Sequence, residues 1–172
     1  MIKNISLEEQ EKALFTELKT KVISLLARRE YSAKELQGKL LTAASSKQTG
    51  MSNEAIELVI ENVLSEMQRL GYQNDARFAS MFVRHKSRAG NGPLKISREL
   101  CFKGGSRDLF EQVVEEEQID FFELAAELMQ RKYSLDQVKD YQTFQKVFRY
   151  FSNRGFTSEQ IKYAKETLLE IE

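Results

Sequence analysis

The sequence predicts an all-α protein made of three tandem three-helix repeats. Apolar residues recur every three or four positions, which is the spacing of one side of a helix. No segment alternates apolar and polar residues for long enough to predict a strand. Only one proline and eight glycines interrupt the 172 residues, and 41% of the residues are hydrophobic. This composition is sufficient for helices that bury a shared core.

Three groups of apolar residues show the helical spacing most clearly. The first group is Leu14, Leu18, Val22, Leu25 and Leu26; the second is Ile56, Ile60, Val63, Leu64 and Met67; the third is Tyr141, Phe144, Val147, Phe148 and Phe151. Each group lies along one side of a helix, and burial of that side against other helices supplies most of the stability.

Local signals predict where the helices begin and end. Four pairs have the spacing of a capping box, in which two side chains bond the open backbone N–H groups of the first turn. They are Ser6 with Glu9, Ser32 with Glu35, Ser134 with Gln137, and Thr157 with Gln160. Gly71, Gly104 and Gly155 are natural helix stops, because glycine adopts the left-handed cap conformation without a clash. Pro93 fits the first turn of a helix.

A pattern of two apolar residues four positions apart, followed by a polar cap and another amphipathic helix, occurs three times. The pairs are Leu36 with Leu40, Ile96 with Leu100, and Val147 with Phe151. A longer helix precedes each pair, at about residues 6–30, 74–89 and 120–133, and residues 42–50 are interpreted as a loop inserted in the first repeat. We expect repeats at 1–72, 73–119 and 120–172, stacked into an elongated, curved array.

The sequence offers no catalytic or metal-binding constellation. One cysteine and one histidine exclude a zinc cluster and a disulfide framework. We expect His85 to lie at the surface and Cys101 to be a small packing residue. No apolar run approaches the ~20 residues of a membrane span, and the first residues lack the apolar stretch of a signal peptide. The expectation is a cytoplasmic protein that is not an enzyme and has no metal, cofactor or membrane partner.

Charge is strongly segregated along a chain whose formal net charge is zero. Residues 77–107 carry eight basic residues and one acidic residue, Glu99, a local formal charge of +7. The basic residues are Arg77, Arg84, Lys86, Arg88, Lys95, Arg98, Lys103 and Arg107. Residues 108–127 contain eight acidic residues and no lysine or arginine. These eight cations are the candidate contacts for a partner or for DNA.

Two interpretations of the basic segment remain open. It is either a solvated helix face against which the acidic stretch folds back, or a surface for an anionic partner, meaning DNA phosphates or an acidic protein face. Segregation favours the second interpretation, because a merely soluble surface usually mixes charges within each helix.

The central stretch resembles the bacterial RecX family of recombination regulators. The resemblance rests on Asn74-Asp75-Ala76-Arg77-Phe78-Ala79, Phe82-Val83-Arg84, Gly92-Pro93-Leu94-Lys95-Ile96 and Glu99-Leu100 with Lys103-Gly104. An N-terminal signature, Leu26-Ala27-Arg28-Arg29-Glu30-Tyr31-Ser32 with Glu35-Leu36 and Lys39-Leu40, and a C-terminal one, Arg154-Gly155-Phe156 with Gln160-Ile161, are similar to those of the same family. The match runs in order over about residues 20 to 170.

The resemblance implies a monomeric modulator of RecA, the strand-exchange ATPase that polymerises on single-stranded DNA. Members of the family bind RecA filaments and suppress filament growth, ATP hydrolysis and strand exchange, which regulates recombination and DNA repair. Direct contact with single- or double-stranded DNA is a further expectation. The alternative is a stand-alone DNA-binding helical module, since three-helix units resemble helix-turn-helix domains in outline.

Overall fold

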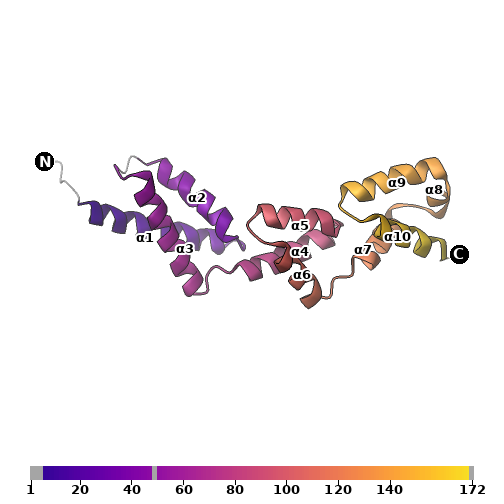
Figure 1. Cartoon of the computed structure of the whole chain (residues 1–172), viewed down its shortest axis with the longest axis horizontal. Helices are drawn as coiled ribbons and strands as arrows, with labels where there is room; N and C mark the ends of the chain where they lie inside the picture. The colour runs from indigo at the N-terminus through magenta and orange to yellow at the C-terminus, as the bar shows by residue number, and fades with distance from the viewer. Residues whose placement is uncertain (1–5, 48–49, 171–172) are drawn as a thin grey trace. The chain divides into compact units, whose positions relative to one another are not determined.

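The computed structural model describes residues 6–47 and 50–170, and this part of the chain contains ten helices and no strand (Figure 1). The helices are α1 (Leu7–Leu26), α2 (Ala33–Ser45), α3 (Asn53–Arg69), α4 (Asp75–Arg88), α5 (Pro93–Phe102), α6 (Arg107–Glu116), α7 (Phe121–Lys132), α8 (Leu135–Lys139), α9 (Tyr141–Asn153) and α10 (Ser158–Glu170). The prediction of an all-α protein is confirmed.

Internal contacts divide the chain into two compact units, Met1–Phe78 and Ala79–Glu172. The division falls inside α4, so the first turn of this helix belongs to the first unit and the rest to the second. The three repeat boundaries and the curved array expected from the sequence stay predictions.

In the first unit, α3 packs against both α1 and α2. The core contains the predicted positions Leu14, Leu18 and Val22 of α1, together with side chains from the other two helices. The predicted helix at 6–30 is four residues too long, because α1 ends at Leu26. Only polar residues and Ala27 follow before Tyr31, so there is no further apolar side to bury and the chain turns toward the cap of α2.

The expected loop at 42–50 is also partly wrong, since α2 continues to Ser45. Ala44 is completely buried in the core of the first unit, and the Thr42 hydroxyl donates to the Gly38 carbonyl at 2.9 Å. Alanine has the highest helix propensity, which favours extension of α2 through this stretch.

Both predicted apolar pairs of the second unit occupy buried positions. Ile96 and Leu100 of α5 and Val147 and Phe151 of α9 are all buried. The most extensive helix pair is α7 with α10, and α10 also contacts α8 and α9 (Figure 1). The segment after α7 holds two helices before α10 rather than one, because the Ser134 capping box opens the five-residue α8.

The helix-start predictions agree closely with the structure. All four predicted capping boxes form, including the reciprocal bonds of Thr157 and Gln160 at 2.9 and 3.2 Å. Pro93 occupies the first turn of α5. Asp140 ends α8 and caps α9, and the side-chain and backbone hydrogen bonds from Thr143 lower the pKa of its carboxyl below the ordinary value.

Within the second unit, the α4–α5 turn and the α9–α10 turn meet backbone to backbone. The Gly92 N–H donates to the Arg154 carbonyl at 2.8 Å, and the Leu94 N–H donates to the Gly155 carbonyl at 3.1 Å. Arg154 Nη1 in turn donates to the carbonyls of Ala89 and Gly90 at 2.9 and 3.1 Å. These bonds hold the first turn of α5 in place.

A methyl group at Gly92 should destabilise the second unit. A Cβ atom there would lie 2.3 Å from the Phe156 nitrogen and 2.4 Å from the Gly155 carbonyl carbon, and both are backbone atoms. We expect Gly92→Ala to lower the free energy of unfolding by about 1–3 kcal/mol, as overpacking does, measured by urea unfolding followed by circular dichroism. Gly38→Ala is the matched control: a Cβ there meets nothing within 4 Å, so the protein should gain about 0.5–1 kcal/mol.

Substitutions of Leu100 and Leu94, both in α5, test which face of this helix is buried. Leu100 is fully buried, whereas 61% of Leu94 is exposed. We expect Leu100→Ala to cost about 2–5 kcal/mol of unfolding free energy, because it leaves a cavity. Leu94→Ala should stay within about 0.5 kcal/mol of the wild type. Equal losses in the same urea experiment would contradict the assignment of the buried face of α5.

Candidate partner-binding site

Of the eight candidate cations, four form ion pairs, three form none among the described residues, and Lys103 lies near an aromatic ring. Arg77, Arg84, Lys86 and Arg107 each form an ion pair. In the described residues, Arg88, Lys95 and Arg98 form none. Lys103, at the C-cap of α5, lies with its Nζ 5.9 Å from the centre of the Phe82 ring.

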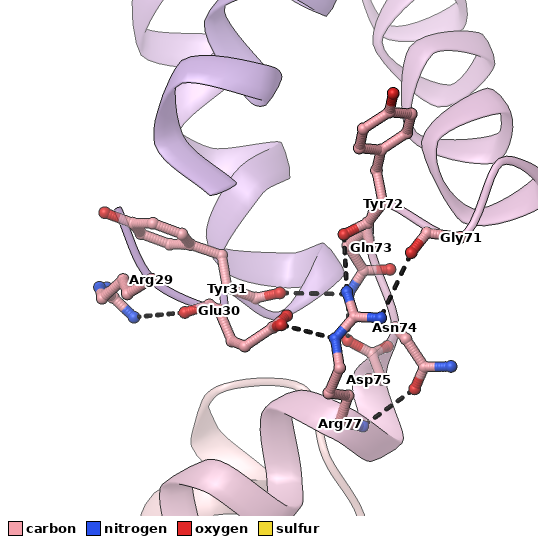
Figure 2. A network of polar contacts seen from close by, with 9 residues as sticks. All are labelled: Arg29, Glu30, Tyr31, Gly71, Tyr72, Gln73, Asn74, Asp75 and Arg77. Atoms are coloured by element: carbon pink, nitrogen blue, oxygen red, sulfur yellow. Dashed lines mark hydrogen bonds and ion pairs between the residues drawn. The ribbon is translucent and has the colours of Figure 1, made fainter. Parts of the chain in front are cut away.

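Arg77 is held in a polar network of the first unit (Figure 2). Its Nε lies 2.5 Å from Glu30 Oε1, and its two terminal nitrogens donate to the carbonyls of Gly71 and Tyr72 at 3.3 and 2.8 Å. The backbone N–H of Arg77 donates to Asn74 Oδ1 at 2.9 Å. Its guanidinium therefore joins the α1–α2 turn to the α3–α4 turn, and this use of its donors makes it a structural residue.

Buried Gln73 and half-buried Asp75 connect the same two turns. Gln73 Nε2 donates to the Tyr31 carbonyl at 3.2 Å and to Asp75 Oδ1 at 2.9 Å. Asp75 Oδ1 also accepts the Ala33 N–H at 2.9 Å. The sequence analysis did not predict this network, because its partners lie about forty residues apart in the chain. The only local signal was the presence of Gln73 and Asp75 near the start of α4.

Three further cations of the basic segment pair within the second unit. Arg84 Nη2 lies 3.4 Å from Glu117 Oε1, and Arg107 Nε lies 2.8 Å from Glu111 Oε1. Both glutamates belong to the acidic stretch 108–127, so the fold-back interpretation describes these two arginines. Lys86 Nζ lies 2.6 Å from Glu99 Oε2, the one acidic residue inside the basic segment.

The α5 surface combines unpaired cations with exposed apolar side chains. Arg98 is exposed and Lys95 is half-buried, while Leu94 and Phe102 are 61% and 82% exposed. Sequence reasoning selected the two cations and missed the two apolar residues. A projection of residues 93–102 around the helix would have found them, because both lie away from the buried pair Ile96 and Leu100.

Cys101 and His85 also lie at the surface. Cys101 is exposed, so its predicted packing role is wrong: it follows Leu100 by 100° around the helix and turns into solvent. His85 is exposed as predicted. Within the residues that the structure describes, no cluster of histidine, cysteine and carboxylate residues could hold a metal ion, and none of the described helices has the length and apolar character needed to cross a membrane.

Comparison with protein-family models identifies two segments of the chain. Residues 74–114 match the model described as RecX, second three-helix domain. Residues 118–164 match the model described as RecX, third three-helix domain.

Curated relatives are similar over most of their length. The regulatory protein RecX of Legionella pneumophila (strain Corby) is 38% identical over 139 residues, which cover 81% of this chain and 86% of the relative. The regulatory protein RecX of Yersinia enterocolitica is 34% identical over 157 residues, covering 85% of this chain and 94% of the relative.

Solved structures share the fold at lower identity. The crystal structure of RecX from Lactobacillus salivarius superposes with a TM-score of 0.72 at 17% identity, covering 91% of this chain and 97% of that one. A second crystal structure, of a regulatory protein RecX, gives a TM-score of 0.66 at 19% identity and covers 96% of this chain and 83% of the other.

The structural role of Arg77 predicts a stability defect. Arg77→Ala removes the only described partner of the Glu30 carboxylate, whose Oε2 is buried without a hydrogen bond. We expect a loss of about 1–3 kcal/mol in the free energy of unfolding, the cost of an unsatisfied buried group, measured by urea unfolding.

Arg107→Ala is the control for this experiment, since it breaks an exposed pair within one helix and should cost no more than about 0.5 kcal/mol. Adding Glu30→Gln to Arg77→Ala should restore part of the loss, because an amide is less costly to leave unpaired than a carboxylate. Equal effects of the two arginine substitutions would show that Arg77 is an ordinary surface residue.

Proposed function

Because this chain belongs to the RecX family of regulatory proteins, we propose that it binds RecA filaments on single-stranded DNA and inhibits their ATP hydrolysis, growth and strand exchange. The single observation that carries the proposal is the identity of 38% over 81% of the chain with a regulatory protein RecX. The protein acts as a monomer in the cytoplasm, where its filament partner forms.

Charge on the second unit supports an anionic partner. Arg88, Lys95 and Arg98 have no ion pair within the described part of the chain, so binding does not first have to break an internal contact. Arg84, Lys86 and Arg107 are already neutralised by their own glutamates. We therefore expect the unpaired cations to contribute most of the electrostatic attraction, and the contribution to fall as salt rises.

Titration of the protein into RecA with single-stranded DNA tests the proposal. The rate of ATP hydrolysis should fall to a low plateau as the protein is added. Unchanged hydrolysis and unchanged strand exchange at saturating amounts would rule out the inhibitory role. Salt-resistant binding to free DNA, with no effect on RecA, would support a stand-alone DNA-binding module instead.

Charge reversal on α5 should weaken inhibition without unfolding the protein. We expect Lys95→Glu/Arg98→Glu to raise the concentration that halves ATP hydrolysis by about tenfold or more, which corresponds to about 1.4 kcal/mol of binding free energy. Arg149→Glu/Lys162→Glu is the charge-matched control, at exposed positions of α9 and α10, and should change inhibition far less. A collapse of the melting temperature in the α5 variant alone would mean that the pair is structural.

A further inference from the structure

One face of α5 presents a row of three exposed side chains. Leu94, Arg98 and Phe102 follow one another at intervals of four residues, so they lie along one side of the helix over about 12 Å. The buried pair Ile96 and Leu100 lies on the opposite side. Lys95 borders the row, at a position about 60° around the helix from Arg98.

The apolar ends of this row lie at the surface of the second unit. Leu94 and Phe102 are 61% and 82% exposed, and Phe102 is the most exposed of the large apolar side chains that the structure describes. A face that only had to stay soluble would carry polar residues at these positions. Large apolar residues exposed on the same helix face are typical of an interaction site.

The start of α5 is bonded to the α9–α10 turn and its end is capped, which favours a rigid row. Gly92 and Leu94 donate to the carbonyls of Arg154 and Gly155 at the start of α5. At its end, the Gly105 N–H donates to the Leu100 carbonyl at 3.0 Å, and a Cβ at Gly105 would lie 2.7 Å from the Leu100 side chain. Rigid presentation lowers the entropy cost of binding.

The charge and the apolar side chains of this face indicate what kind of molecule binds it. Arg98 and Lys95 have no ion pair in the described residues, whereas nearby Glu99 is already bound to Lys86. The face is therefore cationic between two apolar anchors. A base could stack on Phe102, but Leu94 offers no ring, and aliphatic and aromatic anchors about 12 Å apart fit the apolar side chains of a protein segment.

We infer that the α5 face, defined by Leu94, Lys95, Arg98 and Phe102, docks an acidic protein segment with apolar residues on either side of its carboxylates. The inference rests on the proposed function: the segment belongs to a RecA subunit of the filament, and DNA is not what covers this face. The apolar anchors supply affinity, and the two cations select the acidic segment and orient it.

The only cysteine of the sequence allows the occupant to be tested in the unmodified protein. Cys101 is exposed and borders the α5 face, three residues after Arg98 and about 60° from it around the helix. Alkylation of Cys101 by iodoacetamide, followed by mass spectrometry, should slow about tenfold or more when RecA filaments on single-stranded DNA are added. Single-stranded DNA alone should leave the rate unchanged. Protection by the DNA alone would overturn the inference, because nucleic acid would then cover this face.

A pair of double variants tests the apolar anchors. Leu94→Ser/Phe102→Ser should weaken binding to the filament about tenfold or more, measured by co-sedimentation, while its melting temperature stays within a few degrees of the wild type. Leu58→Ser/Tyr141→Ser changes side chains of similar exposure, 57% and 75%, and should bind normally.

The two proposals fail in different ways. If the unmodified protein does not bind the filament at all, the proposed function falls and this inference falls with it. If the unmodified protein binds but the α5 variant binds equally well and Cys101 stays reactive, only the inference is overturned.

Discussion

Each helix that the structure describes has an apolar side, and burial of that side against other parts of the fold stabilises it. Eight of the ten described helices have 14 residues or fewer, and isolated helices of this length are marginal in water. The helices are therefore stabilised mainly by packing against one another. In the first unit α3 packs on α1 and α2, and in the second unit α7 packs on α10. Hydrogen bonds between turns then fix the positions of these turns. Gln73 bonds Tyr31 in the first unit, and Gly92 bonds Arg154 in the second.

The sequence was informative wherever the signal was local. A capping box is recognised from two residues three positions apart, and Ser32 with Glu35 and Thr157 with Gln160 formed as predicted. The partner of Arg77 could not be found in this way, because Glu30 lies 47 residues earlier in the chain. The exposure of Cys101 was misjudged for another reason: it adjoins a buried residue in sequence but not around the helix.

The formal charge of +7 counted for residues 77–107 includes cations that form ion pairs within the protein. Arg84 and Arg107 are each answered by a glutamate of the acidic stretch, and Lys86 by Glu99. The cations without an ion pair among the described residues are therefore fewer than the count of eight basic residues suggests. The fold-back interpretation therefore describes part of the segment, because the acidic stretch pairs with Arg84 and Arg107. Other cations, such as Arg98, are exposed without an ion pair among the described residues, and their role as a partner surface stays a prediction.

The network around Arg77 also determines where the protein can be divided. A fragment that stops at residue 72, the repeat boundary expected from the sequence, would lose the side chains of Gln73, Asp75 and Arg77. The Tyr31 carbonyl, the Ala33 N–H and the Glu30 carboxylate would then lose the bonds that these residues supply. A first unit intended to fold independently must therefore extend into the opening turn of α4, at least to Phe78.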